Sequence, residues 1–324
     1  MKVRKVILIT AIGSFSADIV IKNLKKNDYK IIGCDIYPKE WLVDSHNVNE
    51  FYQVPLSSNE NEYIEALLNI CTRENVELIC PLTDVEIDVL TKYRHIFEEE
   101  GIILTISSDR TIRLCRNKEE TARYLKNIEG LHLIKTYNKE CLEKEKIQFP
   151  VVCKKVNGRS SQGLHYFYKE SELIEFVEEN DMESYLVQPF ISGNILTVDV
   201  VRSEKDKQGV AVVRRELLRT LNGAGTSVYV FNDNELETLC LKIAELLNIN
   251  GCVNFEFIEN EDGTRYFLEC NPRFSGGVEF SCIAGYDFVS NHIRCFGGEK
   301  IDLTKNVLNQ YISRKYEEYV TALK

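Results

Sequence analysis

Two glutamates stand close together in one predicted hairpin, within the segment VNFEFIENEDGTRYFLECNPRF at 253–274. Asp262-Gly263 is a dipeptide typical of tight hairpin turns, and a turn centred on it pairs Glu256 with Glu269. A four-residue loop gives the same register. Directly opposed carboxylates lie roughly 5 Å apart and repel each other, so a cation between them would stabilise the pair. Mg²⁺ prefers such hard oxygen ligands and often completes its shell with waters and nucleotide phosphates.

The same pairing places Asn254 opposite Asn271, on the face that carries both glutamates. The other face is expected to enter the core with Phe255, Phe257, Leu268 and Cys270. A glutamate pair alone is also typical of a solvated polar face. Arg273, in Asn271-Pro272-Arg273, adds a guanidinium that can hold an anion beside the carboxylates. We therefore expect a metal–phosphate site with Glu256, Glu269 and Asn271 as metal ligands.

Strand and helix patterns alternate over the first hundred residues and predict a doubly wound parallel sheet. The expected strands cover 3–10, 30–38, 77–83 and 101–107, and the expected helices cover 16–26, 60–74 and 85–99. Such sheets bind ligands beyond the carboxyl ends of their strands. The residues expected at that edge are Gly13, Ser14, Asp35, Asp84 and Glu86. A dinucleotide site needs three glycines in its first turn, whereas AIGSFSAD has one, so NAD binding is not expected.

After residue 110 the pattern changes to a mixed α+β arrangement, which indicates a second domain. The expected strands cover 149–155, 164–168, 184–190, 196–201 and 209–217, and the expected helices start near Thr111 and cover 170–179 and 233–248. The loop VNGRSSQG has small residues whose backbone N–H groups could cradle phosphate, although an ordinary connecting turn is the alternative. Lys154 shares a strand face with two valines, so its partly desolvated ammonium should seek an anion.

The string ECNPRFSGG, which begins thirteen residues after the glutamate of NFEF, resembles the metal-binding signature of the ATP-grasp superfamily. The likeness is to carbamoyl-phosphate-synthase-like members and to amino-acid ligases. It implies an α/β pre-ATP-grasp domain over 1–110, which contains ICPLTDVEIDVL, and an α+β ATP-grasp domain over 111–324. The second domain would have a first lobe at 111–184 with a glycine-rich lid loop, and a second lobe at 185–324 with the metal site.

Further segments resemble the nucleotide-binding parts of this family, in the family's order. RNKEETARYL and FPVVCKK look like the segments that carry two phosphate-binding basic residues, here Lys118 and Lys154. The resemblance assigns the lid loop and the adenine-binding hinge VQPFISG to Gly158, Ser160, Ser161, Gly163, Gln188 and Phe190. RREL…NGAGT looks like the substrate-side segment and suggests Arg215 as an anion contact. A substrate contact through backbone N–H groups is expected at Ser275, Gly276 and Gly277.

Three positions depart from the family's usual pattern. Lys155 stands where a proline is usual, and Gln188 stands where the hinge usually has a glutamate. Ile195 takes the place of the glutamate that binds ribose, so the neighbouring Asn194 is the candidate for that contact. Asp199 is expected to be structural.

The resemblance implies an ATP-dependent ligase with two Mg²⁺ ions, for which Mn²⁺ is a workable substitute. The γ-phosphoryl group would pass to a small carboxylic acid, an amino acid being the favoured class, and an amine would then displace phosphate. Arg273 would steady the γ-phosphate or the intermediate. The alternatives are a carbamate- or bicarbonate-phosphorylating relative and a non-catalytic nucleotide sensor, the latter suggested by Ile195.

Composition limits the other classes of function. The formal net charge of −10 argues against a nucleic-acid partner or an anionic membrane surface. The 11 cysteines are odd in number and lie mostly in apolar runs, which favours free buried thiols in a reducing compartment. The start of the chain lacks the pattern of a signal peptide, so a cytoplasmic protein is expected. A homodimer is compatible with the sequence, and small molecules are the expected partners.

Overall fold

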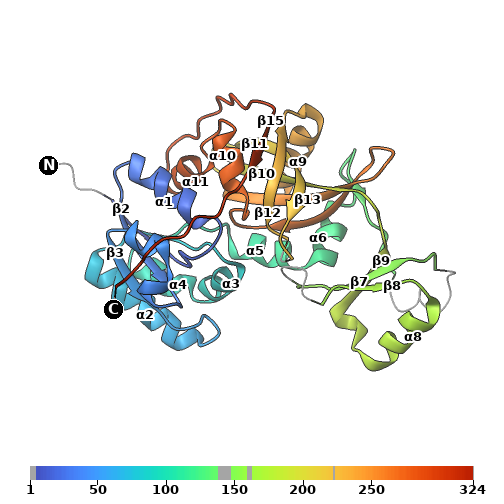
Figure 1. Ribbon diagram of the computed structural model, residues 1–324, viewed down its shortest axis with the longest axis horizontal. Coiled ribbons are helices and arrows are strands. Elements are labelled where there is room, and N and C mark those ends of the chain that lie inside the picture. Colours follow the sequence, from blue (N-terminus) through green and yellow to red (C-terminus); the bar gives the residue numbers. More distant parts are fainter. Residues whose placement is uncertain (1–4, 138–146, 159–162, 222, 324) are drawn as a thin grey trace.

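The computed structural model describes residues 5–137, 147–158, 163–221 and 223–323. Its N-terminal part is a parallel sheet in the order β3-β2-β1-β4-β5, which confirms the doubly wound pattern (Figure 1). The strands are β1 (Val6–Ile9), β2 (Lys30–Asp35), β3 (Glu50–Gln53), β4 (Leu78–Cys80) and β5 (Ile103–Leu104). The helices are α1 (Ala17–Lys26), α2 (Glu60–Glu74), α3 (Asp84–Lys92) and α4 (Arg94–Glu99), with 3₁₀ turns η1 (Lys39–Trp41) and η2 (Val43–His46).

The inner strands of this sheet, β1, β2 and β4, are buried on both faces because they are mainly apolar. Ile7 and Ile9 enter one core cluster with α1, while Leu8 enters another cluster with α2 and α3. Parallel sheets covered by helices on both sides show this continuous apolar pattern. The helix predicted at 85–99 is divided in two at Tyr93, and β3 was not predicted.

The central part is a seven-stranded sheet in the order β15-β12-β11-β10-β13-β14-β6. Its strands are β6 (His132–Leu133), β10 (Asn194–Ser203), β11 (Gln208–Arg219), β12 (Gly225–Phe231), β13 (Gly251–Glu259), β14 (Arg265–Asn271) and β15 (Gln310–Ser313). The associated helices are α5 (Asp109–Arg116), α6 (Lys118–Leu125), α9 (Asn234–Leu246), α10 (Val278–Ile283) and α11 (Phe288–Gly297). All pairings are antiparallel except that between β14 and β6.

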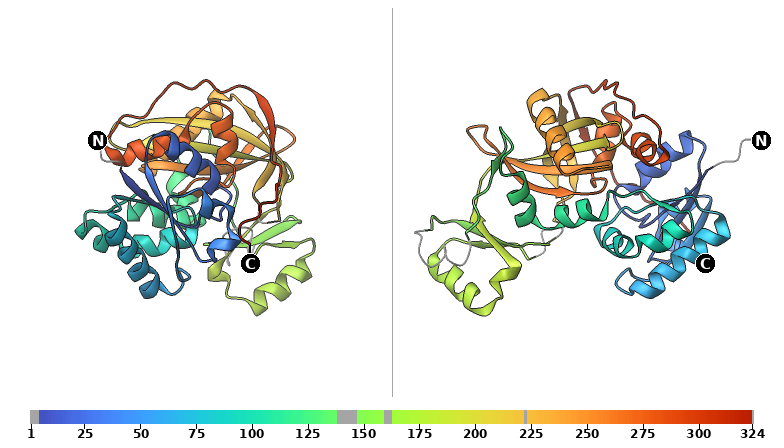
Figure 2. Two further views of the ribbon diagram at one scale, coloured as in Figure 1. Left: turned by 60° about the vertical axis from the view of Figure 1, so that its left-hand side comes forward. Right: turned by 180° about the vertical axis from the view of Figure 1, so that it is seen from behind.

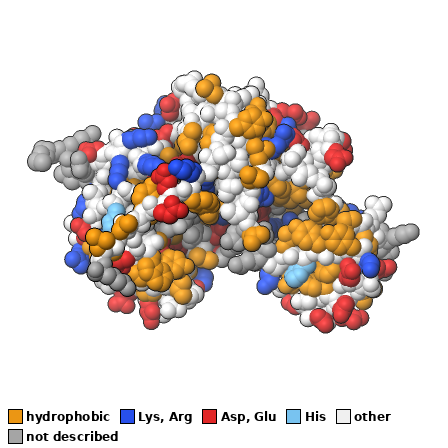
Figure 3. Space-filling view, viewed as in Figure 1, with side chains coloured by type: hydrophobic (Ala, Val, Ile, Leu, Met, Phe, Trp, Pro, Cys, Tyr) orange, Lys and Arg blue, Asp and Glu red, His pale blue; other side chains and the backbone are white. Residues whose placement is uncertain are grey.

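A small lobe extends from this sheet (Figures 1 and 2). It contains a three-stranded antiparallel sheet, β8-β7-β9, and helix α8. Its elements are β7 (Val151–Lys155), β8 (His165–Phe167), α8 (Glu170–Glu179), η3 (Met182–Ser184) and β9 (Tyr185–Pro189). β9 pairs with β7. This strand was expected to begin the second lobe, at residue 185, but in the structure it belongs to the small lobe. Figure 3 shows a hollow beside this lobe and hydrophobic side chains gathered on it.

The remaining features concern the cysteines and the C-terminal segment. The ten cysteines described are all unpaired, and eight of them are buried, as expected for free thiols.

After α11 the chain crosses back over the N-terminal domain, where the Thr321 hydroxyl donates to the Glu40 carbonyl (Figure 1). None of the helices described is long and apolar enough to cross a membrane.

Candidate active site

The predicted pairing of Glu256 with Glu269 is confirmed, and it depends on a bulge. Asn254 pairs with Asn271 and Glu256 with Glu269, but the register then shifts by one residue toward the turn. The turn therefore differs from both predicted loops: the Asn260 N–H donates to the Thr264 carbonyl at 3.0 Å, which closes a loop over 261–263.

The bulge changes which side chains enter the core. Phe255, Phe257 and Cys270 are buried there as expected, but Phe267 joins them instead of Leu268. The core assignment of Leu268 was wrong because the bulge turns this side chain toward the site, where it lines a cavity.

Lys118 links the two lobes at the glutamate pair. It is the first residue of α6, and its ammonium donates to the Gly158 carbonyl at 2.7 Å. The same ammonium lies 3.0 Å from Glu269, whose carboxylate also accepts from Asn271 Nδ2 at 3.2 Å. A cation thus already neutralises one member of the acidic pair.

Burial and neighbouring charges give the ionisable groups unequal proton affinities. Burial, with the negative charge of Glu269, raises the pKa of Glu256 to about 7. Burial alone would also raise the pKa of Glu269, but the nearby ammonium groups of Lys118 and Lys154 hold it below its ordinary value. Burial lowers the pKa of Lys154 to about 8, which fits the desolvated ammonium expected from the sequence. The site therefore favours a cation at the glutamates and an anion at Lys154.

Two cavities meet at the glutamate pair. Cavity A, about 250 Å³, lies between the small lobe and the central sheet, and cavity B, about 480 Å³, lies between the central sheet and the N-terminal domain. The residues that line both are Arg219, Glu256 and Glu269.

Cavity A combines basic, aromatic and aliphatic side chains. Predicted site residues that line it are Lys118, Lys154, Gly158, Gln188 and Phe190, together with Glu256 and Glu269. Gln188 Nε2 donates to Thr136 Oγ1, whereas its Oε1 is buried and has no partner among the residues described. A ligand N–H would satisfy that oxygen. This combination suits a flat aromatic ligand that carries an anionic group.

Four residues predicted for the nucleotide side are not among the described residues that line cavity A. Gly163 and Asn194 are described but do not line it, and Asn194 is exposed at the start of β10. Ile195 does line it. Ser160 and Ser161 lie outside the described residues.

Cavity B contains most of the predicted substrate residues. Ser14, Asp84, Asn271, Arg273, Ser275, Gly276 and Gly277 all line it. Arg273 donates to Asp84 at 2.8 Å, and Arg116 pairs with the same carboxylate at 2.7 Å. Burial would raise the pKa of Asp84, but the two guanidinium groups hold it well below its ordinary value.

The other residues predicted at the edge of the parallel sheet have internal roles in this structure. Asp35 accepts from the Gly13 N–H at 2.8 Å and fixes the turn after β1. Glu86 is buried and accepts from Tyr63 and Thr83 hydroxyls. Gly13, Asp35 and Glu86 do not line cavity B within the described part of the chain.

Arg215 does not reach either cavity among the residues described. It pairs with Glu259 and stacks on Phe231, on the face of β11 that packs away from the glutamate pair. Its neighbour Arg214 points the other way and lines cavity B. The motif therefore supplies an arginine at the site, but one position earlier than expected.

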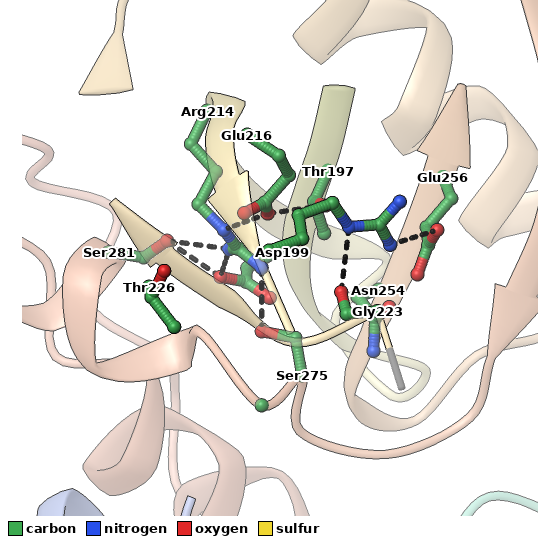
Figure 4. A network of polar contacts seen from close by, with 12 residues as sticks. Thr197, Asp199, Arg214, Glu216, Gly223, Thr226, Asn254, Glu256, Ser275 and Ser281 are labelled. Carbon is green, nitrogen blue, oxygen red and sulfur yellow. Dashed lines mark hydrogen bonds and ion pairs between the residues drawn. The ribbon is translucent and has the colours of Figure 1, made fainter. Parts of the chain in front are cut away.

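Arg214 is held in a buried polar network (Figure 4). Its guanidinium pairs with Asp199 and lies 2.9 Å from Glu216, and it donates to Ser275 at 3.0 Å. Thr197 donates to the same Glu216 at 2.8 Å. Asp199 is fully buried and has the structural role expected of it. Alternation along RRELLR could have suggested Arg214 and Glu216, since both share a strand face.

Family models match two parts of the chain. Residues 181–317 match the model described as ATP-grasp in the biosynthetic pathway with Ter operon, and 7–105 match the PylC-like N-terminal domain. Over residues 181–317 the chain thus matches an ATP-grasp domain.

Sequence relatives of this chain include large chains of carbamoyl phosphate synthase. That of Clostridium beijerinckii is 23% identical over 299 residues, which is 87% of this chain and 27% of the relative. That of Clostridium perfringens strain SM101 is 24% identical, over 86% of this chain and 27% of the relative. The chain thus spans about a quarter of the length of these proteins.

Solved structures share the fold of this chain. A biotin carboxylase complex from Campylobacter jejuni has a TM-score of 0.79 at 17% identity, covering 95% of this chain and 74% of that one. An L-amino acid ligase from Bacillus licheniformis has a TM-score of 0.67 at 16% identity, covering 89% and 73%. N5-carboxyaminoimidazole synthetase from Staphylococcus aureus has a TM-score of 0.74 at 17% identity, and the match covers 94% of this chain and 81% of that one.

The donor set of this ATP-grasp site fits a hard divalent cation. Two carboxylates and an amide face one another where Lys118 and Arg219 now supply the positive charge. No group of three or more His, Cys, Asp or Glu side chains suited to a metal occurs in the residues described. A bound ion would therefore take its other ligands from water and phosphate.

Proposed function

We propose that this protein is an ATP- and Mg²⁺-dependent ligase that activates a small carboxylic acid as an acyl phosphate and joins it to an amine. The observation that carries the proposal is the meeting of cavities A and B at Glu256 and Glu269. A phosphoryl group bound in one cavity can therefore reach an acceptor in the other past these carboxylates.

Cavity A is assigned to ATP. Phe190 and the unpartnered Gln188 oxygen would bind adenine, and Lys118 and Lys154 would hold the phosphates. Glu256, Glu269 and Asn271 would hold Mg²⁺, which supplies charge neutralisation of the phosphates when bound. The segment 158–163 is assigned to exclusion of water, as a lid.

Cavity B is assigned to the carboxylic acid and the amine. A carboxylate oxygen attacks the γ-phosphorus and forms an acyl phosphate as ADP departs. The amine nitrogen then attacks the acyl carbon, and the C–O bond to phosphate breaks, which gives an amide and inorganic phosphate. Arg273 and the backbone at Ser275, Gly276 and Gly277 would stabilise the oxyanions, since all four line this cavity.

A nucleotide sensor without turnover is the second candidate. The aliphatic side chain of Ile195 lines cavity A where the family usually has a ribose-binding glutamate. Purified protein should be incubated with MgATP and a pool of amino acids, and ADP and phosphate release measured. Release that depends on an amino acid supports the ligase, whereas tight ATP binding without release supports the sensor. Amino-acid-independent release that requires bicarbonate would instead support a carbamate- or bicarbonate-phosphorylating enzyme.

A further inference from the structure

Arg219 has an unusual position for a residue that the sequence motifs did not select. It lies at the end of β11 and, with Glu256 and Glu269, lines both cavities. Its Nη2 donates to Glu256 Oε2 at 3.3 Å, and its side chain is 29% exposed. Each glutamate of the acidic pair therefore has its own organic cation: Lys118 at Glu269 and Arg219 at Glu256.

An irregular strand pairing brings Arg219 to this place. Glu216 pairs with Val228, but the register shifts before Leu218 and again before Arg219. With regular alternation Arg219 would share the face of Arg215, which points away from the site. The irregularity turns it back toward Glu256.

The hairpin tip is shaped to hold this guanidinium. Arg219 Nε donates to the Gly223 carbonyl at 2.7 Å. Gly223 has φ +85°, and a Cβ there would lie 3.1 Å from Arg219 Nη2, so glycine fits both the backbone and the side chain. Glu256 and the Gly223 carbonyl thus hold the group from two sides (Figure 4).

This contact competes with a metal ion. The Glu256 oxygen that faces Arg219 belongs to the carboxylate assigned to Mg²⁺, and a guanidinium and a divalent cation cannot share one oxygen at close range without strong repulsion. A long, partly exposed side chain can move away easily, because a partly exposed ion pair contributes little to stability. Once displaced, Arg219 still lies at the junction of the two cavities.

We propose that Arg219 competes with a divalent cation for Glu256: it pairs with this carboxylate until a metal binds, and is then released to bind the phosphoryl group that passes into cavity B. The second half rests on the proposed ligase function, whereas the first does not. Arg219 is then a catalytic residue of the loaded enzyme.

The first test measures metal binding without nucleotide or turnover. Mn²⁺ is titrated into the protein, and free Mn²⁺ is followed by electron paramagnetic resonance. Arg219→Gln should bind Mn²⁺ about two- to fivefold more tightly than the unmodified protein, since the competing cation is gone. Arg219→Lys, which keeps the charge, should lie closer to the unmodified protein.

The matched control is Arg265→Gln. Arg265 also pairs with a glutamate of β13, at 3.1 Å from Glu259, has a comparable exposure of 25%, and lines neither cavity among the residues described. Its replacement should leave Mn²⁺ affinity unchanged. Circular dichroism should show that both proteins are folded. If Arg219→Gln then binds Mn²⁺ with the same affinity as the unmodified protein, Arg219 does not compete with the metal for Glu256, and the proposal is overturned.

The second test separates binding from turnover. With the acid and amine found by the substrate screen, Arg219→Gln should lower kcat by about a hundredfold and leave MgATP affinity within about twofold. An unchanged kcat would overturn the proposal that Arg219 binds the phosphoryl group after its release from Glu256. If the unmodified protein shows no turnover with any substrate, the ligase proposal fails, while the Mn²⁺ result still decides the competition.

Discussion

Of the two paired glutamates, Glu269 has the charge that its neighbours stabilise more strongly. Lys118 and Asn271 both contact it, and its pKa lies below the ordinary value because of the neighbouring ammonium groups. It therefore remains ionised and available to a cation at neutral pH. Burial and the negative charge of Glu269 raise the pKa of Glu256 to about 7, so a bound cation would favour its ionised form.

Replacing Glu269 by glutamine should remove most of the activity without unfolding the protein. The amide keeps the shape and a hydrogen-bonding oxygen but loses the charge that a divalent cation requires, so turnover should fall by about a hundred- to a thousandfold. Phosphate release reports turnover, and circular dichroism reports the fold. Glu261→Gln, in the exposed hairpin turn, is the control and should retain full activity. Normal turnover of Glu269→Gln would remove the metal assignment.

Lys154 gives a pH dependence with a defined sign. Its pKa of about 8 means that the nucleotide-free protein loses this positive charge as the pH rises through that value. The charged form is the one that attracts phosphate, so nucleotide affinity should be full below about pH 8 and fall by up to about tenfold per pH unit above it.

Equilibrium binding of a fluorescent nucleotide from about pH 6.5 to about pH 9.5 checks this dependence on Lys154. Lys154→Ala should bind more weakly at low pH and lose the slope above about pH 8. The same slope in the variant would show that another group controls affinity.

At the scale of elements, the sequence predicts regular helices and strands well, but it does not predict where strand pairing becomes irregular. The helix expected at 60–74 is found with those bounds, and the pairing of Glu256 with Glu269 is correct. The predicted register is correct although the predicted turn is not, because a bulge near Leu268 compensates for a loop that differs by one residue. Bulges leave no clear mark in a single sequence, since the extra residue has ordinary chemistry.

The same limit explains the arginines of β11. The sequence pointed to Arg215, whereas Arg214 and Arg219 face the cavities. The orientation of Arg214 can be predicted, because alternation places it on the same strand face as Glu216. The orientation of Arg219 depends on two register shifts that the residue types do not predict. Cavity B was missed as a unit for a related reason: its walls come from segments near residues 14, 84, 216 and 275, which only the tertiary fold brings together.

The hairpin between β11 and β12 should be sensitive to one added methyl group. A Cβ on Gly225 would lie 2.0 Å from Glu216 Oε2, and Glu216 is fixed by Arg214 and Thr197. Gly225→Ala should therefore destabilise the protein by about 1–3 kcal/mol and lower turnover, because the hairpin that carries Arg219 must shift. Thermal unfolding and phosphate release measure the two effects.

Gly263→Ala is the comparison for Gly225→Ala. Its Cβ would meet no atom within 4 Å, and only its φ of +85° opposes alanine, so it should cost about 1 kcal/mol and leave turnover intact. Equal effects of the two substitutions on turnover would show that the Gly225 contact does not position the site.

The whole molecule consists of a parallel-sheet domain, a central sheet and a small lobe (Figures 1 and 2). The residues that line each cavity come from two of these parts, so each cavity lies at a junction. Cavity B depends on how the N-terminal domain sits against the central sheet. The C-terminal segment after β15 contributes to that placement, since Arg314 lies over the rings of Phe15 and Phe280. Arg314 Nη2 also donates to the Gly276 carbonyl at 2.6 Å.

Arg314→Ala should therefore act on cavity B more than on cavity A. The change removes two cation–π contacts and a hydrogen bond, which together should cost about 1–3 kcal/mol of stability. Phe15 and Gly276 line cavity B, so the KM for the carboxylic acid should rise while the KM for ATP changes little. Lys315→Ala removes a neighbouring side chain that is 83% exposed and should change neither value. An equal rise of both KM values would show that Arg314 supports the general fold and not the seating of the N-terminal domain at the substrate cavity.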